Sequence, residues 1–322
     1  MLENIIGISN NGREKSLFGN SKNTDRMTKL QKRILKVYRV FKKFCDQNSL
    51  RYYAEGGTKI GASYWKGFIP WDDDMDVVMP LDDYEKLIRL AKEGKLPRNI
   101  ALLNGLESVT SDIVFSKFHD TSTTFVNNMH LPYPENWTGV FVDIFPMIGL
   151  PKGHDERLAF VDELTRTVCK ISRGKSLGEF DKGELGKATE KLRRMMREFE
   201  YGESEFVAPV HPSSNKEIFE RHDFDRAVSV KFQDSEIWRP RHAKEQIDAQ
   251  YPGFEKMPKN VDRTGHGGLI DLNKSVMEYV EKLSEESLLL ECFWLMNKGT
   301  RRLKDKNAEL RQDPFFVNPR AE

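Results

Sequence analysis

Apolar side chains recur every three or four residues in five stretches of the chain, and this spacing predicts amphipathic helices. The first helix is expected to begin at Thr24 or Asp25, which are suitable N-caps, and to end near Gln47. Lysine and arginine fill its polar side. We interpret that side as the solvated face of a helix packed on a sheet, with a membrane-surface helix as the alternative. Its apolar face contains Met27, Leu30, Ile34, Val37, Tyr38, Phe41, Phe44 and Cys45.

The remaining helical stretches lie further along the chain. The second is expected to be capped by Asp82 or Asp83. The basic side of the fourth could meet anionic lipid or a polyanionic acceptor, although a solvated face is the default interpretation. Residues 202–270 show weak periodicity and are expected to form an irregular, pocket-shaping segment. The stretches run from residue 82 or 83 to about 93, over 155–177, over 184–200, and from Asn273 or Ser275 to about Lys298.

Short runs with alternating or continuous apolar residues predict strands between these helices. In the second of these runs, alternation would place Asp74, Asp76 and Val78 on one face. Strands mixed with helices in this order indicate an α/β (α+β) protein with a mixed sheet flanked by helices and a helical or irregular C-terminal half. The predicted strands cover residues 52–55, 74–79, 113–118, 123–126 and 140–145.

Four carboxylates crowd the segment just before and within the second predicted strand: Asp72, Asp73, Asp74 and Asp76. Neighbouring carboxylates a few Å apart repel one another by several kcal/mol at an effective dielectric of about 20. Two carboxylates on one strand face can hold the same Mg²⁺ or Mn²⁺ ion, which relieves this repulsion. We therefore expect Asp74 and Asp76 to be metal ligands, with Asp72 a ligand or a residue just behind them. A solvated acidic loop is the alternative.

A glycine turn precedes these acids. Gly56, Gly57 and Thr58 follow a predicted strand and open a helix-compatible run. Backbone N–H groups in such a turn can approach a phosphate closely because no Cβ intervenes. Lys66, in the loop over the acids, and Lys117, on a strand, could neutralise phosphate charge. For both lysines a surface salt bridge is an equal alternative.

Asp143 interrupts the apolar strand predicted over residues 140–145. A carboxylate there costs several kcal/mol unless it is paired or bound to a metal. We expect Asp143 to lie beside Asp74 and Asp76 as the third metal ligand. A structural salt bridge is the alternative.

A glycine turn followed by a D-x-D strand is the layout of nucleotidyltransferase-fold enzymes. The segment 56–87, GGTKIGASYWKGFIPWDDDMDVVMPLDDYEKL, closely resembles the signature of the LicD family of phosphocholine transferases, which includes the fukutin-type ribitol-phosphate transferases. Asp143-Ile144-Phe145-Pro146 resembles a second family feature. The resemblance covers residues 27–150 well and 230–270 patchily. One departure is Tyr64-Trp65, where family members usually carry Arg-His.

The resemblance implies a nucleotidyltransferase-like sheet and a metal-dependent phosphotransferase. Its donor would be a CDP-activated alcohol, with CDP-choline favoured. Its acceptor would be a hydroxyl of a cell-surface glycan or glycolipid such as lipopolysaccharide, teichoic acid or capsule, and CMP would be released. Three alternatives remain open from the residues: a nucleotidyltransferase that uses NTP on RNA or a small molecule, a non-catalytic glycan-binding relative, and a structural interaction protein.

Charge and composition narrow these classes. The 322 residues carry 51 basic and 50 acidic side chains, a balance that favours no nucleic acid partner. The three cysteines lack metal-ligand spacing and indicate a reducing, cytoplasmic setting. We expect no signal peptide or transmembrane segment, with peripheral membrane contact at the acceptor. The expected organisation is a flexible lead over 1–23, a catalytic core over 24–150, a part completing the site over 151–299, and a polar tail over 300–322.

Overall fold

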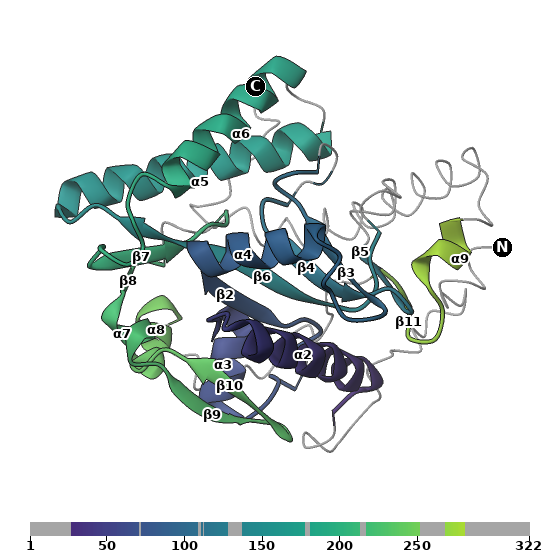
Figure 1. The fold of residues 1–322 in the computed structure, drawn as a ribbon. Helices are drawn as coiled ribbons and strands as arrows, with labels where there is room; N and C mark the ends of the chain where they lie inside the picture. Colours follow the sequence, from purple (N-terminus) through teal and green to yellow (C-terminus); the bar gives the residue numbers. More distant parts are fainter. Residues whose placement is uncertain are drawn as a thin grey trace, which may run out of the picture.

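Helices and strands are interspersed along the chain in the computed structural model, which describes residues 27–70, 72–108, 111, 113–127, 137–177, 181–212, 217–251 and 268–280 (Figure 1). In chain order the elements are α2 (Lys29–Asn48), β1 (Tyr53–Ala54), α3 (Gly56–Tyr64), β2 (Asp76–Pro80), α4 (Leu81–Lys92), β3 (Ile100–Asn104), β4 (Ser116–Asp120), β5 (Thr124–Asn127), β6 (Phe141–Leu150), α5 (His154–Leu177), α6 (Lys182–Met196), β7 (Phe206–Pro209), β8 (Phe219–Glu220), α7 (His222–Asp225), β9 (Val228–Phe232), β10 (Ser235–Arg239), α8 (Ala243–Gln250), β11 (Gly268–Asp271) and α9 (Val276–Val280).

The main sheet has the strand order β1-β2-β6-β4-β3. Strand β7 also pairs with β6, and β8 pairs with β7. Strands β2 and β6 run parallel, whereas the other neighbours in this sheet run antiparallel. Two separate pairs, β9–β10 and β5–β11, are also antiparallel. The expected fold class, a mixed sheet flanked by helices, is confirmed.

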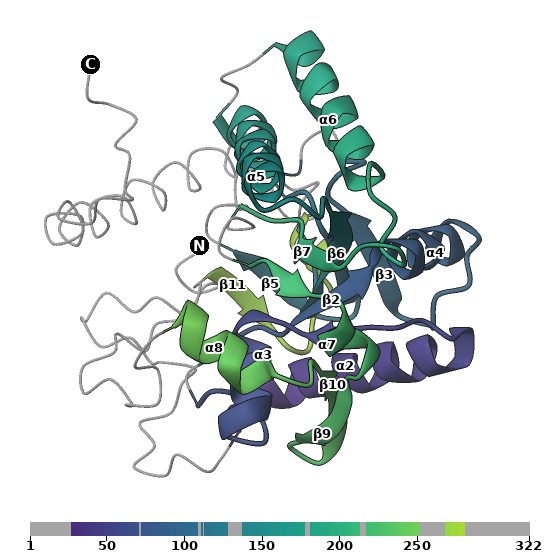
Figure 2. The ribbon, with the colours of Figure 1, turned by 90° about the vertical axis from the view of Figure 1, so that its left-hand side faces the viewer.

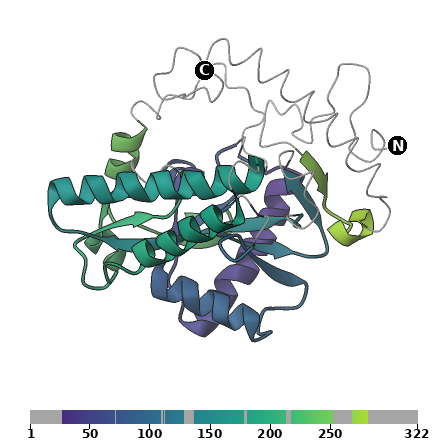
Figure 3. The same cartoon turned by 90° about the horizontal axis from the view of Figure 1, so that it is seen from above.

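Helices cover the sheet on both sides. Val77, Val142 and Ile144 point to one face, where they are buried with the apolar sides of α2 and α4. Alternation along the strands places Asp76 and Asp143 on the opposite face. Helices α5 and α6 pack against each other on the side of the sheet away from α2, as Figures 1 and 2 show, and run beside each other when seen from above (Figure 3). The acids thus share the face opposite α2 with apolar residues such as Val78 and Met147, which are buried in a second cluster.

The first helix begins later than the sequence pattern predicted. Thr28 is its N-cap, and a capping box joins Thr28 with Gln31: each side chain accepts from the other residue's backbone N–H at 3.0 Å. These two bonds satisfy amide groups that the first helical turn leaves without partners, so they decide the start in place of Thr24 or Asp25. Similarly, α4 begins directly after Pro80. Asp83 caps nothing there and instead pairs with Arg51 at 2.7 Å.

Each of the five predicted strands differs from its predicted bounds, and two of these differences bear on the acids. Strand β2 begins at Asp76, so Asp74 lies in the preceding loop and does not share a strand face with Asp76. Strand β4 begins at Ser116, three residues later than predicted, because its register pairs Ser116 with both Ile144 and Asn104. The periodicity of a short strand is too weak to set its ends.

The segment expected to be irregular, residues 202–270, contains strands and helices. Strands β9 and β10 form a hairpin whose turn contains Gln233 with a positive φ of 56°. Phe232 and Ile237 from the hairpin are buried in the same core as α2. Strand β9 alternates apolar and polar residues over its five positions, VSVKF, so the strand pattern was present in the sequence and was overlooked.

None of the described helices is both long and apolar enough to cross a membrane. The expected lead over 1–23, the tail over 300–322, and residues 281–298 of the last predicted helix lie outside the described residues.

Candidate metal and phosphate site

Strands β2 and β6 place two carboxylates side by side. Asp76 opens β2 and pairs in parallel register with Asp143 of β6. The Asp143 N–H donates to the Met75 carbonyl at 2.8 Å, which fixes this register at the start of the strand. Asp143 is buried and Asp76 is half-buried. Two acids that lie far apart in the sequence therefore share the sheet face opposite α2.

The loop before β2 adds more carboxylates. Oxygens of Asp72, Asp73 and Asp74 lie within 4.8 Å of one another. Burial raises the pKa of Asp76 well above its ordinary value of 3.8, and the charges of Asp74, Asp143 and Asp72 raise it further. The acids thus destabilise one another's ionised forms, which is the electrostatic setting that a divalent cation relieves. An all-oxygen donor set of this kind fits Mg²⁺ or Mn²⁺.

Two glycines at the start of α3 face these acids. Gly56 has a positive φ of 50°, and a Cβ built on it would lie 3.0 Å from Asp76 Oδ2. A Cβ on Gly57 would lie 2.6 Å from Asp72 Oδ2, closer than real contacts allow. The backbone at the N-terminus of α3 therefore approaches the carboxylates directly, in space that only glycine leaves open.

Thr58 and the residues around it hold this helix start in place. The Thr58 hydroxyl accepts the Asp76 N–H at 2.9 Å, so it bonds to the backbone of β2. Lys59 and Glu55 form a buried ion pair at 2.9 Å, and the Lys59 ammonium lies 4.4 Å from the centre of the Phe219 ring. The Thr58 bond ties the first turn of α3 to the strand that carries Asp76, and the ion pair between Lys59 and the N-cap residue Glu55 stabilises the turn itself.

Lys117 lies at the site, paired with Asp143. Its Nζ donates to both carboxylate oxygens of Asp143, at 2.7 and 2.9 Å, and both side chains are about nine-tenths buried. The ammonium also lies 3.5 Å from the centre of the Phe141 ring. The salt bridge considered as an alternative for Asp143 is therefore present, and it brings a buried positive charge to the acids.

Lys66, unlike Lys117, has no described contact with the acids. Its side chain is exposed, and its backbone adopts a positive φ of 55° in the turn after α3. The Lys66 carbonyl accepts the Gln233 N–H at 2.6 Å, which joins this turn to the β9–β10 hairpin. The described contacts of Lys66 thus serve the turn rather than the acids.

Sequence reasoning missed residues that position the acidic loop. Gln31 is buried on the apolar side of α2, and its side-chain amide donates to the carbonyls of Ile69 and Asp72 at 3.2 and 3.0 Å. A polar residue at a core position was the available signal. Asp73, which is buried, was named among the four crowded carboxylates but was given no role.

The departure at Tyr64-Trp65 has a packing role. Both rings lie against a small apolar cluster formed by Ile60, Ile69 and Ile247. The Tyr64 hydroxyl donates to Asp248 at 3.1 Å. These aromatic residues join the end of α3 to α8.

Comparison with known proteins identifies the segment that holds this site. The LicD/FKTN/FKRP nucleotidyltransferase domain model matches residues 49–168. A lipopolysaccharide cholinephosphotransferase, LicD, of Haemophilus influenzae is 44% identical over 54 residues, which cover 17% of this chain and 20% of that protein. The chain thus matches about a fifth of the length of that curated relative. Residues 49–168, which carry the glycine turn and the facing acids, thus match the LicD/FKTN/FKRP nucleotidyltransferase domain model.

Proposed function

We propose that this protein is a metal-dependent phosphotransferase that moves a phospho-alcohol from a CDP-activated donor to a glycan hydroxyl and releases CMP. The observation that carries the proposal is the convergence at one point of Asp76, Asp143 and the glycine-rich start of α3. Acids that repel one another gather there beside backbone N–H groups suited to phosphate. If the acids served only the fold, nothing would require glycine at the two positions where any larger residue would place its Cβ against a carboxylate.

The donor set suits Mg²⁺ or Mn²⁺, held by Asp74, Asp76 and Asp143 with Asp72 beside them. When bound, the ion would neutralise charge on the phosphate oxygens of the donor. Burial, and then the charges of the neighbouring acids, raise the pKa of Asp76, and a bound cation would stabilise its ionised form against both effects.

Residues of the chain itself would bind the donor phosphates, stabilise the leaving group and accept the proton. Backbone N–H groups of Gly56 and Gly57 bind and orient the donor phosphates. The Lys117 ammonium offsets negative charge that develops on the departing CMP oxygen. The acceptor hydroxyl oxygen bonds to phosphorus as the bond to CMP breaks, and Asp143, as the alternative to its role as a metal ligand, takes the hydroxyl proton.

The choice of donor and acceptor follows the relative. The partly matching Haemophilus influenzae protein is named for phosphocholine transfer to lipopolysaccharide. We extend this to CDP-choline as the favoured donor and to a cell-surface glycan or glycolipid as the acceptor. Tyr64 and Trp65, which stand where family members usually carry Arg-His, pack against α8. Through this difference the chain could prefer another donor than that relative does.

The test is CMP release from CDP-choline, CDP-ribitol and CDP-glycerol, with Mg²⁺ and a glycan acceptor. We expect a CDP-alcohol to be consumed by the wild-type protein and not by Asp76→Asn. The matched control is Asp46→Asn, an exposed acid on α2 paired with Lys42, which should keep full activity. Turnover of NTPs in place of CDP-alcohols would assign the site to nucleotidyl transfer. Turnover that persists in Asp76→Asn would contradict the proposal.

A further inference from the structure

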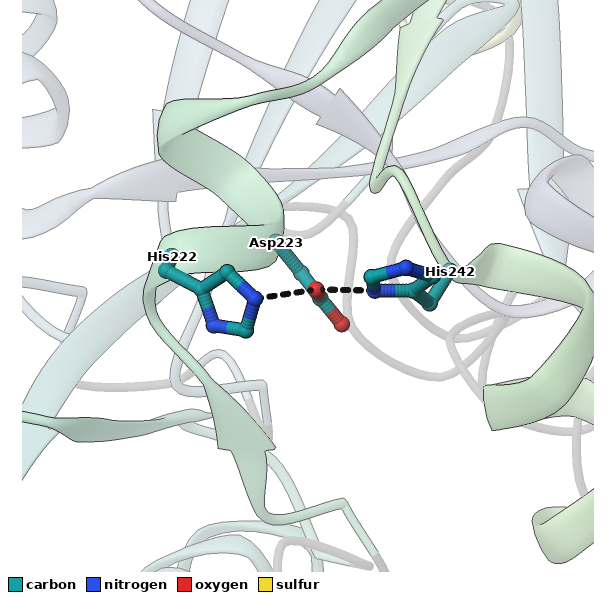
Figure 4. Close-up of side chains that lie close together, drawn as sticks. All are labelled: His222, Asp223 and His242. Carbon is teal, nitrogen blue, oxygen red and sulfur yellow. Dashed lines mark hydrogen bonds and ion pairs between the residues drawn. The ribbon is translucent and has the colours of Figure 1, made fainter.

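Two histidines and an aspartate meet outside the acid site, at the junction of α7 and α8. Asp223 Oδ1 lies 2.6 Å from His242 Nδ1 and 3.5 Å from His222 Nε2. Figure 4 shows the carboxylate between the two imidazole rings. One possible ligand atom from each residue lies within 4.8 Å of the others. We propose that His222, Asp223 and His242 form a structural site for Zn²⁺ or a similar transition-metal dication.

The spacing of the three groups suits this ion. Tetrahedral Zn²⁺ with ligands at about 2.0 to 2.1 Å keeps neighbouring ligand atoms about 3.3 Å apart. The separation between Asp223 and His222 already has this size, at 3.5 Å. The hydrogen bond between Asp223 and His242 needs to open by less than about 1 Å for the ion to replace its proton.

Neighbouring groups orient two of the ligands. The second oxygen of Asp223 accepts from the Gln246 side chain at 2.9 Å, which turns Oδ1 toward the rings. Glu220 Oε2 lies 3.1 Å from His222 Nδ1 and suits the proton on that nitrogen. The His222 Nε2 lone pair then faces a carboxylate oxygen, an arrangement that a cation between them resolves. Carboxylate partners behind a ligating imidazole are typical of zinc sites.

Burial at the cluster also fits a metal site. The Asp223 side chain is 8% exposed, whereas each histidine side chain is 46% exposed. The carboxylate is therefore held by the protein, and the imidazoles leave room for water as the fourth ligand. Two nitrogen ligands and one oxygen favour Zn²⁺ over Mg²⁺, unlike the all-oxygen group near β2.

The ion would brace the part of the fold that contacts the acid site. His222 and Asp223 lie on α7, and His242 is the N-cap of α8, so the β9–β10 hairpin lies between them in the chain. The hairpin turn binds the Lys66 carbonyl through the Gln233 N–H. Ile247 of α8 packs against Ile60 of α3. A metal at the hairpin base would thus restrain both contacts.

The test uses the full chain stripped with a chelator and then supplied with Zn²⁺ in excess Mg²⁺, which occupies oxygen-only sites. We expect one zinc equivalent and a rise in Tm on the order of 5 °C at about 100 times Kd. His222→Gln and His242→Gln should lose both effects. His154→Gln should keep them: it removes an exposed histidine that also lies 3.1 Å from an aspartate but that forms no such cluster with a second histidine among the described residues.

Two further readouts keep the result clear if a variant folds poorly. Co²⁺ should give the strong visible absorption of a tetrahedral site in wild type and in His154→Gln only. Hydrogen exchange in residues 228–239 should slow with Zn²⁺ in wild type and not in His222→Gln. No zinc binding by the wild type, or the same binding in all variants, would overturn the proposal and leave the cluster a hydrogen-bonded pair of His242 and Asp223 with His222 beside it.

Discussion

The buried pair of Lys117 and Asp143 is the residue-level feature on which the site depends most. Both side chains are about nine-tenths buried and joined by two hydrogen bonds. We predict that Lys117→Met lowers the free energy of unfolding by about 3 kcal/mol or more, because the Asp143 carboxylate loses its ammonium partner. Urea denaturation without metal measures this loss.

The double variant Lys117→Met/Asp143→Asn is the control for this pair, and it should recover most of the stability because no ammonium or carboxylate is left unmatched. If Asp143 also binds metal, Mg²⁺ should stabilise Lys117→Met more than wild type. Equal losses in the single and double variants would show that the pair contributes packing and not charge.

His119 gives the protein a predictable dependence on pH. It is buried, and its Nδ1 accepts the Gly139 N–H at 3.2 Å. Burial and the charge of Lys117 lower its pKa from 6.5 to about 4. Between these values the unfolded chain binds the proton and the folded protein does not. Stability therefore falls as pH drops from about 6.5 to about 4, by up to about 1.4 kcal/mol per pH unit.

His119→Asn keeps an acceptor for Gly139 and removes the titration. We predict a shallower loss of Tm for this variant than for wild type over the same acid range, measured by thermal denaturation in matched buffers. Parallel curves would show that the histidine does not stay neutral in the fold.

At the scale of elements, glycines in two helices offer a matched comparison. A Cβ on Gly57 of α3 would meet Asp72 Oδ2 at 2.6 Å, whereas a Cβ on Gly186 of α6 meets nothing within 4 Å. Both changes to alanine improve helix propensity. We predict that Gly57→Ala lowers transfer activity about 100-fold with little change in Tm, because Asp72 swings aside.

Gly186→Ala should leave activity unchanged and raise the free energy of unfolding by about 0.5 to 1 kcal/mol. Steady-state transfer rates and melting curves of purified Gly57→Ala and Gly186→Ala measure both effects. Similar activity in both would mean that the close approach of α3 to the acids has no part in the reaction.

The existence of most elements was predictable, and their ends were less so. Strong apolar periodicity predicted α2, but a capping box with Gln31 set its start at Thr28. The same glutamine reaches the acidic loop, a contact that no local pattern encodes. The β9–β10 hairpin was missed although β9 alternates apolar and polar residues, because five residues are too few for periodicity alone to identify a strand.

For the whole molecule, the sequence predicted that Asp76 and Asp143 would meet. Each stood as a charge in an apolar strand, and parallel pairing of β2 and β6 brings them into register. The placement of Asp74 in a loop, and of Lys117 against Asp143, depends on the assembled sheet and was beyond the reach of periodicity. The cluster at His222 and His242 lies in the segment with the weakest pattern.

The most direct test of the central claim is the affinity for CDP-choline, measured by calorimetry with and without Mg²⁺. Binding should require Mg²⁺ and should weaken at least about tenfold in Asp76→Asn, which corresponds to about 1.4 kcal/mol. Asp155→Asn, a change at a fully exposed acid on α5, should bind as wild type does. Equal affinity with and without Mg²⁺, or in Asp76→Asn and wild type, would contradict a cation-bridged donor at these acids.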